Sequence, residues 1–466
     1  MAIGVRHAWI PNSKEEIKRE MLDFIGVKDV LDLYNDVPED ILISEDKWNS
    51  LNIGMKRPLD EIEVSEIIED ILNKNIVFGP RKQFIGGGAW PHYIPASVRY
   101  LAERGEFLTA YTPYQAEINQ GLMQTLFEYQ SMMADLLDMD VVNSSMYDMA
   151  SSLGEVILMA ARIKKKNKVI VPEVINPFHL SVARSYSAPH GIQLKKYKID
   201  KETGYLDVED VKNEIDDNTI AVYLEYPYQF TGVVDINAKA LGEIAHEKQA
   251  LFIVGVNPIS LMLYKPPGEL DADIAIGEGQ PLGLGLNFGG PYLGIFATKW
   301  KNELVRQMPG RIIGLTEDSS SSNAYAMVLQ TREQHIRRSK ATSNITTNSS
   351  LNAMIAAFYV ALLGRKGLRD VAEAIWYRSH YASRELKKIG LDSPLFTGEF
   401  FGDFIVDFKK DFKEIRKSML KQGILLGIPL ANYVEWARES WGLLSFTEVH
   451  HKEDIDFVLD KIREFM

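Results

Sequence analysis

Residues 111–117, a Tyr-Thr-Pro-Tyr-Gln-Ala-Glu stretch, carry the densest set of side chains that could do chemistry. Tyr111 and Tyr114 offer phenol hydroxyls, Gln115 an amide and Glu117 a carboxylate, around a proline that fixes the backbone. A rigid loop of this kind suits the binding of a small polar ligand. A turn that packs its aromatic rings on the core and caps the next helix would use the same residues, so the pattern leaves both interpretations open.

Residues 332–340 concentrate positive charge in a chain whose formal net charge is -12. Arg332, Arg337, Arg338 and Lys340 could bind a phosphate, a carboxylate or an acidic partner surface. His335, among them, could transfer protons near neutral pH. The alternative is a solvated charged face with a structural histidine.

Two further stretches have chemistry that simpler explanations also cover. The segment 279–291 is rich in glycine, which allows close backbone approach, but it matches no P-loop or dinucleotide motif. Residues 147–152 supply Asp148 and Ser151 before a helix, whose N-terminus would attract an anion such as a cofactor phosphate. Tight turns and helix capping are the more economical explanations of these two stretches.

The composition excludes several classes of site. The chain has 466 residues and no cysteine, which rules out thiol nucleophiles, Cys-ligated zinc and iron–sulfur clusters. The nine histidines are scattered, so we predict no metal site, and the net acidity argues against nucleic-acid binding. Residues 1–12 lack an apolar leader and the apolar stretch 353–363 is short for a bilayer, which predicts a cytoplasmic protein without a membrane span.

The order of elements predicts an α/β protein. Short runs rich in β-branched residues are expected to be strands, at 168–171, 219–224, 251–256, 273–276 and 292–297. Amphipathic helices are expected between or before them, at 122–137, 151–164 and 237–246. Strands that alternate with helices indicate a large, mostly parallel sheet covered on both faces.

The two ends of the chain have different patterns. At the N-terminal end, a capping box at Ser13 should start a helix that ends at Gly26, and a second helix should span 65–73. Residues 84–95 should form an irregular loop, and 316–323 a polar loop. A small α+β domain should follow, with helices at 348–363, 368–389 and 453–465 and strands at 404–408 and 442–449. We therefore expect an N-terminal helical arm (1–80), a large α/β domain (81–330) and a connecting helix with a C-terminal domain (331–466).

Taken in order, several motifs resemble one protein family. They are Phe84-Ile85-Gly86-Gly87-Gly88-Ala89-Trp90-Pro91-His92-Tyr93-Ile94-Pro95, Tyr111 to Glu117, Ser145-Met146-Tyr147-Asp148, Gly277-Glu278-Gly279-Gln280, Phe288-Gly289-Gly290-Pro291-Tyr292-Leu293-Gly294, Met308-Pro309-Gly310-Arg311 and Gln330-Thr331-Arg332-Glu333-Gln334-His335-Ile336-Arg337-Arg338. The chain resembles, over nearly its whole length, the alpha chains (subunit 1) of the two-subunit glycine dehydrogenase (decarboxylating), the P-protein of the glycine cleavage system.

This resemblance implies a fold, a cofactor and partners. The fold would be that of aspartate aminotransferase, known as fold type I among pyridoxal phosphate (PLP) enzymes. The assembly would contain two alpha and two beta chains, with PLP bound by the beta subunit. The reaction would be decarboxylation of glycine, followed by transfer of the aminomethyl group to the lipoyl arm of H-protein.

The resemblance also implies that this chain has no cofactor chemistry of its own. Gln280 stands where the family's beta chains have the Schiff-base lysine, and an amide nitrogen cannot condense with an aldehyde. Asn257 stands at the position of the carboxylate that keeps the ring nitrogen protonated. Met149 and Ser151 replace a Gly and a Thr that the family usually has after its Tyr-Asp pair. No residue between Lys265 and Lys299 is a lysine.

The expected role is therefore indirect. His92, Tyr111, Tyr114, Gln115 and Glu117 would line the entrance of the active site of the beta subunit. The cluster Arg332, His335, Arg337, Arg338 and Lys340 would pair with the partner subunit or help to dock H-protein. The alternatives are a self-contained PLP enzyme that recruits Lys265 or Lys299, and a scaffolding homologue without a catalytic role.

Overall fold

The structure is a computed structural model that describes residues 12–55, 57–330, 333–341, 343, 345 and 349–465. The chain divides into two compact units, Met1–Ile76 and Val77–Met466. The first unit contains short helices, and the second contains the sheets and the remaining helices.

The first unit has one 3-10 helix, η1 (Val30–Tyr34), and three α-helices among its described residues: α1 (Glu15–Ile25), α2 (Glu45–Ser50) and α3 (Glu61–Leu72). The expected capping box at Ser13 is wrong, because the N-cap is Lys14 and no side chain caps the helix. Gly26 ends α1 as expected, in the left-handed conformation that favours glycine. Helix α3 begins before the predicted Ser65 because Asp60 and Glu63 form a capping box.

A seven-stranded sheet with the order β2-β8-β7-β6-β5-β3-β4 organises the second unit. Its parallel strands are β3 (Lys168–Pro172), β4 (Gln193–Tyr197), β5 (Thr219–Tyr226), β6 (Leu251–Val256) and β7 (Ile274–Glu278). The strands β2 (Val141–Val142) and β8 (Gly294–Thr298) add an antiparallel edge. The predicted, mostly parallel sheet is confirmed. Strands β5 and β6 are buried along their whole length, as apolar strands between two helical layers must be.

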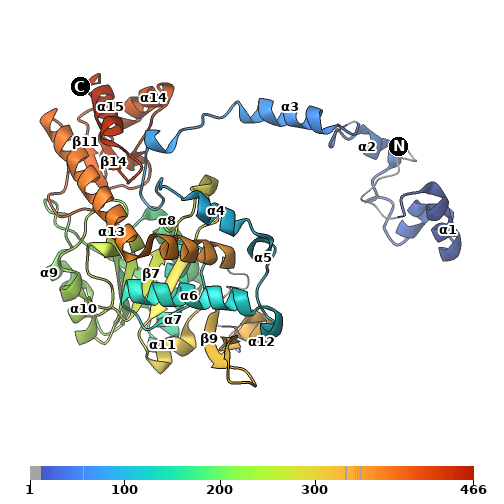
Figure 1. The fold of residues 1–466 in the computed structure, drawn as a ribbon, viewed down its shortest axis with the longest axis horizontal. Coiled ribbons are helices and arrows are strands. Elements are labelled where there is room, and N and C mark those ends of the chain that lie inside the picture. Colours follow the sequence, from blue (N-terminus) through green and yellow to red (C-terminus); the bar gives the residue numbers. More distant parts are fainter. Residues whose placement is uncertain are drawn as a thin grey trace. The chain divides into compact units, whose positions relative to one another are not determined.

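Helices cover both faces of this sheet (Figure 1). One face packs against α7 (Met149–Lys164), α8 (Pro177–Ser187) and α11 (Asn302–Gln307). The other packs against α6 (Gln120–Leu137), α10 (Ala238–Glu247) and α13 (Ser350–Lys388). Successive side chains of a strand point to opposite faces, so β5 contributes to the cores on both sides of the sheet. Tyr223 packs in the core with α7, α8 and α11, and Leu224 packs in the core with α6, α10 and α13. Shorter helices are α4 (Ala96–Ala102), α5 (Gly105–Leu108), α9 (Val208–Glu214) and α12 (Gln334–Arg337).

Helix α13 contains the two helices expected at 348–363 and 368–389. Gly364 separates them with φ 60 and ψ -178, a conformation that is open essentially only to glycine. By length and composition α13 could cross a membrane, and it is the one helix of the described residues that could. Ala353, Met354 and Tyr359 are nevertheless buried in the main core, which is the use that a globular fold makes of an apolar helix.

The C-terminal part of the second unit is α+β. Its three-stranded sheet has the order β11 (Asp403–Asp407), β14 (Trp441–Ser445) and β13 (Ile428–Pro429). Helices α14 (Phe412–Lys421) and α15 (Lys452–Arg463) enclose a core of their own. Strand β1 (Gln83–Phe84) pairs with β12 (Leu425–Leu426). The start of the loop at 84–95, which contains Gly86, Gly87 and Gly88 and is called the glycine-rich loop below, is therefore attached to this part.

A β-hairpin occupies the segment expected to be a polar loop at 316–323. Its strands are β9 (Ile312–Glu317) and β10 (Asn323–Val328), so the loop prediction holds only for the turn between them. The Asp318 carboxylate accepts hydrogen bonds from the backbone N–H groups of Ser320 and Ser322, which closes that turn. The serine run therefore supplies a local turn.

Candidate functional site

Gln280 follows strand β7 at the carboxyl edge of the sheet, where ligands bind in open α/β folds. Its side chain is fully buried, and the hydrogen bonds of its side-chain amide hold the glycine-rich loop at this edge. Oε1 accepts from Trp90 N at 3.0 Å, and Nε2 donates to Trp90 O and Leu284 O, each at 3.0 Å. All the hydrogen-bonding capacity of the amide nitrogen is used within the protein. Gln280 thus ties residue 90 to the loop after β7.

Asn257 follows the neighbouring strand β6 and turns back on its own chain. It caps the 3-10 helix η5 (Pro258–Met262), with Oδ1 accepting from Ile259 N at 3.1 Å. Its backbone oxygen accepts from the Ser260 hydroxyl at 2.7 Å. Asn257 is 6% exposed, so this capping role is sealed from solvent.

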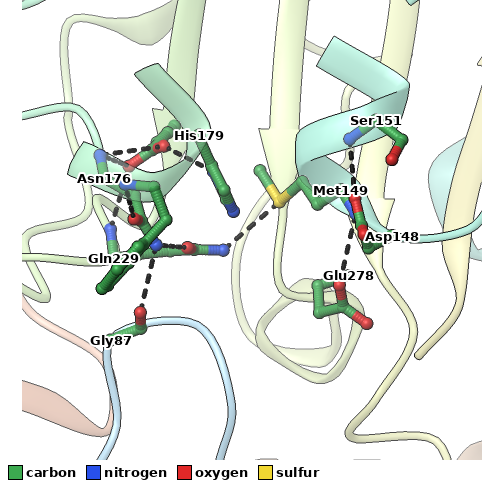
Figure 2. Close-up of polar contacts among 10 residues, drawn as sticks. Gly87, Asp148, Met149, Ser151, Asn176, His179, Gln229 and Glu278 are labelled. Atoms are coloured by element: carbon green, nitrogen blue, oxygen red, sulfur yellow. Dashed lines mark hydrogen bonds and ion pairs between the residues drawn. The ribbon is translucent and has the colours of Figure 1, made fainter. Parts of the chain in front are cut away.

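The N-terminus of α7 lies against the end of β7, and a carboxyl group of the protein already occupies it. Asp148 caps the helix through Ser151 N, at 2.6 Å. Glu278 Oε2 accepts from Met149 N at 3.2 Å (Figure 2). Its Oε1 accepts from Gln280 N at 2.9 Å. A helix N-terminus with free N–H groups would attract an anion such as a phosphate. Here Glu278 takes that place.

Burial raises the pKa of Glu278 to about 8, although backbone N–H groups of Met149, Gln280 and Leu293 lower it. Burial dominates because the group is 3% exposed and no cation faces it among the causes that shift its pKa. The carboxyl group is therefore largely protonated at neutral pH. A neutral acid at this helix end forms hydrogen bonds without a buried charge.

Met149 fills the space beside this helix end. Its Sδ accepts from Gln229 Nε2 at 3.2 Å, and a Cβ built on Gly255 would lie 2.4 Å from its methyl carbon. Gln229 also contacts Asn176. Asn176 Nδ2 donates to Gln229 Oε1 at 2.7 Å and to Gly87 O at 3.1 Å. Figure 2 shows this chain of contacts, which runs from α7 to the glycine-rich loop.

His92, expected at the entrance of a partner's site, is placed inside the second unit. Its side chain is 1% exposed, and Nδ1 lies 2.8 Å from Glu448 Oε2. Burial raises the pKa of Glu448, but His92 and the Tyr93 N–H outweigh it, so the pKa is lowered overall. The structure therefore gives His92 a partner within this chain.

Tyr114 connects the two clusters that the sequence singled out. Its hydroxyl accepts from Arg311 Nη2 at 2.8 Å, and the ring of His335 packs edge-on against its ring, with centroids 5.5 Å apart. Arg311 also pairs with Glu333 at 3.2 Å, with side chains 2% and 9% exposed. Arg311 and Glu333 were not selected as site residues, although both stand in the motifs quoted for the resemblance.

The other candidate residues of the Tyr111–Glu117 stretch are open to solvent. Tyr111 is 67% exposed, and Gln115 and Glu117 are exposed as well. Of the basic cluster, Arg337, Arg338 and Lys340 are exposed, while Arg332 lies outside the described residues. One face of the Tyr114–Arg311–Glu333 group is thus fixed inside the fold, and its surroundings are available to another molecule.

The two lysines considered for a self-contained enzyme are poorly placed for one. Lys299 pairs with Asp271 and donates its backbone N–H to Asp273, just before the start of β7. Gln280 follows the other end of that strand. Lys265 is exposed.

Comparisons with known proteins agree over almost the whole chain. A family model described as glycine cleavage system P-protein matches residues 7–462. The chain belongs to the glycine cleavage system P-protein family.

Two archaeal relatives of this P-protein family are similar end to end. A probable glycine dehydrogenase (decarboxylating) subunit 1 from Aeropyrum pernix is 53% identical over 458 residues, covering 98% of both chains. A protein of the same description from Staphylothermus marinus is 53% identical over 464 residues, covering 99% of this chain and 98% of the relative.

Solved structures extend the comparison to the fold. A crystal structure of a glycine decarboxylase (P-protein) in inhibitor-bound form superposes with a TM-score of 0.86 at 36% identity, over 99% of this chain and 100% of the other. A sphingosine-1-phosphate lyase of Burkholderia pseudomallei, 14% identical over 89% of this chain and 92% of the other, has a TM-score of 0.63 and shows the fold alone. The expected PLP fold type I is confirmed.

PLP is the cofactor that this fold family implies, and the residues present here do not fit it. Gln280 is no imine-forming amine, Asn257 is no carboxylate, and the N-terminus of α7 faces Glu278. Gln280 and Asn257 are committed to hydrogen bonds within the chain. As a P-protein family member, this chain keeps the fold around a site closed by its own side chains.

Proposed function

We propose that this chain is the subunit of glycine decarboxylase that does not carry the cofactor. Gln280 is the observation that carries the proposal, because its amide is fully used in tying residue 90 to the sheet. PLP would be bound by a second subunit of the same family. Two copies of each subunit would form the enzyme, in the cytoplasm, and the aminomethyl group of glycine would pass to lipoylated H-protein.

In this proposal Tyr114 and its neighbours help to form the wall of the partner's active site. Tyr114 is held by Arg311, which is itself held by Glu333, so the phenol has a fixed direction although it is 44% exposed. A fixed, exposed polar group suits a wall that a second protein completes. Tyr111, Gln115 and Glu117 lie on the same stretch and would contribute to the same wall. The basic residues Arg337, Arg338 and Lys340 would contact the partner subunit or H-protein.

Reconstitution tests the assignment. The purified chain, a second subunit, PLP, glycine and lipoylated H-protein should together release CO2 from labelled glycine, and the chain alone with the same components should release none. Turnover by the isolated chain would contradict the proposal, and would favour a self-contained enzyme. No turnover with any second subunit would favour a homologue without a catalytic role.

Tyr114→Phe tests the contribution to the wall. The assembled enzyme should lose at least several-fold in rate, because a positioned hydroxyl is removed from a closed site. Tyr100→Phe is a matched control, since Tyr100 is also exposed and lies on α4 outside the Tyr111–Glu117 stretch. Equal rates for Tyr114→Phe and the control, with equal assembly, would show that Tyr114 does not act on the reaction.

A further inference from the structure

The first unit, Met1–Ile76, has apolar side chains that its own fold does not cover. None of the residues in α1, η1 or α3 is buried. Phe24 is 93% exposed, Ile41 68% and Trp48 55%. Apolar side chains of this size gain roughly 1.5–3 kcal/mol each when they are fully buried. A segment of several helices that leaves them uncovered is built to be covered by something else.

Helix α3 shows the geometry of the uncovered surface most clearly. Val64, Ile67, Ile68 and Ile71 follow the i, i+3, i+4, i+7 spacing that places side chains on one face of a helix. Their exposed fractions are 45%, 37%, 48% and 52%. The opposite face carries acidic residues such as Glu66 and Asp70. This apolar stripe of α3 is the form in which a helix binds in a groove.

The charge of the unit indicates what kind of groove would fit. Met1–Ile76 contains 9 Lys or Arg and 17 Asp or Glu, a formal charge of -8, while Val77–Met466 carries -4. Docking on the second unit of the same chain, or on a second copy, would bring together units whose net charges have the same sign, which electrostatic complementarity disfavours. A different protein with an apolar groove bordered by Lys and Arg is the better match.

We propose that the apolar stripe of α3 is a docking helix for the second, PLP-binding subunit, in an apolar groove with a basic rim. The inference rests on the proposed function for the existence of that subunit. Acidic side chains beside the stripe, such as Glu61 three residues before Val64, would meet the rim of the groove and fix the direction of the helix. The first unit would then gain its core only in the complex.

Single substitutions in the full chain test the proposal. Ile67→Asp and Ile71→Asp should each weaken the complex with the second subunit at least tenfold, measured by sedimentation or by titration with a labelled partner. Ile62→Asp is the matched control, because Ile62 is on the same helix, 71% exposed, and lies on the opposite face from the stripe. It should change affinity less than twofold. The three isolated variants should unfold at the same temperature as the unmodified chain, since none of these side chains is buried.

Cleavage by a glutamate-specific protease gives a second readout. In the isolated chain α3 should be cut readily at Glu66 or Glu69, and in the complex it should be protected. Protection already present in the isolated chain would mean that the stripe docks on the second unit, and would overturn the proposal. Self-association that is lost in Ile67→Asp would also overturn it, in favour of a second copy.

Equal affinity of Ile67→Asp and the unmodified chain for the second subunit would refute the docking helix directly. That outcome is distinct from failure of the proposed function. In that second case the complex would form and depend on Ile67, but it would not decarboxylate glycine.

Discussion

At the scale of single residues, Gln280 shows how one buried amide can hold two loops together at the carboxyl edge of the sheet. The amide reaches both the N–H and the C=O of Trp90, which a lysine ammonium could not do because it has no acceptor. Glu278 likewise binds N–H groups that would otherwise face a ligand. Substitution at either position therefore tests a structural role.

Restoring a lysine should not restore a cofactor site. Gln280→Lys should remove the hydrogen bond accepted from Trp90 N and place an amine at a fully buried position. We expect a loss of stability of about 2–4 kcal/mol, from unmade hydrogen bonds and an unpaired buried amine, measured by urea unfolding. With PLP added, no aldimine absorbance should appear. Gln280→Met is the control for the loss of the hydrogen bonds alone. An aldimine band that borohydride fixes to residue 280 would contradict the interpretation.

The raised pKa of Glu278 predicts a pH dependence. With a folded-state pKa of about 8 and an unfolded-state pKa near the ordinary value of 4.5, the folded protein binds one more proton between these two pH values. Unfolding then releases this proton, so the group's contribution is full at low pH and falls by about 1.4 kcal/mol per pH unit as pH rises through this window.

Glu278→Gln should abolish that slope, because the amide is neutral at every pH. The free energy of unfolding of both proteins is measured by urea unfolding from pH 5 to 8. As the pH rises, the variant should become progressively more stable relative to the unmodified chain. Asp70→Asn, an exposed position in α3, should leave the slope unchanged. A difference between Glu278→Gln and the unmodified chain that is constant with pH would show that Glu278 is ionised throughout.

The sequence pointed to these residues unequally. Gln280 and Asn257 were identifiable because a family motif defines which residue type the chemistry needs at each position. The hydrogen bonds that hold them were not, since Trp90 is 190 positions away from Gln280. The contact between His92 and Glu448 was hidden for the same reason, because Glu448 is far along the chain. Tyr114 and His335 were found separately, and their contact depends on a fold that no local pattern gives.

At the scale of elements, local patterns predicted the inner strands of the seven-stranded sheet but neither of its edge strands, β2 and β4. Strand β6 and helix α6 carry strong apolar patterns and lie close to their expected ranges. Strand β4 was missed because its residues are mostly exposed lysine and glutamine at the sheet edge. Helix α14 was missed although it is amphipathic, and the β9–β10 hairpin was read as loop because its turn is polar.

The break in α13 depends on one glycine. Gly364→Ala should destabilise the protein by about 1–3 kcal/mol, because φ 60 with ψ -178 is accessible essentially only to glycine, although a Cβ would meet no atom within 4 Å. Thermal unfolding should show a lower midpoint. Gly121→Ala, in α6 where the added Cβ also meets nothing, should be neutral or slightly stabilising. If both variants unfolded alike, the break would not require glycine.

At the scale of the whole molecule, the chain combines a large unit that has extensive apolar cores with a small unit whose described residues include none that is buried. The fold of the large unit follows from apolar periodicity and is shared with a sphingosine-1-phosphate lyase, so the fold alone does not identify an activity. Periodicity also predicted helices in the small unit, but an amphipathic pattern does not reveal what covers its apolar face.

Hydrogen exchange should separate the two units in the isolated chain. Amides of β5 and β6 should be protected up to the free energy of global unfolding, because these strands are buried along their length and lie in the middle of the sheet. Amides of α1 and α3 should exchange within tenfold of unstructured peptides, because short helices without tertiary packing are marginal in water. Mass spectrometry of peptic peptides would measure both. Strong protection of α3 in the isolated chain would mean that the small unit has a core after all, and that its stability does not depend on a partner.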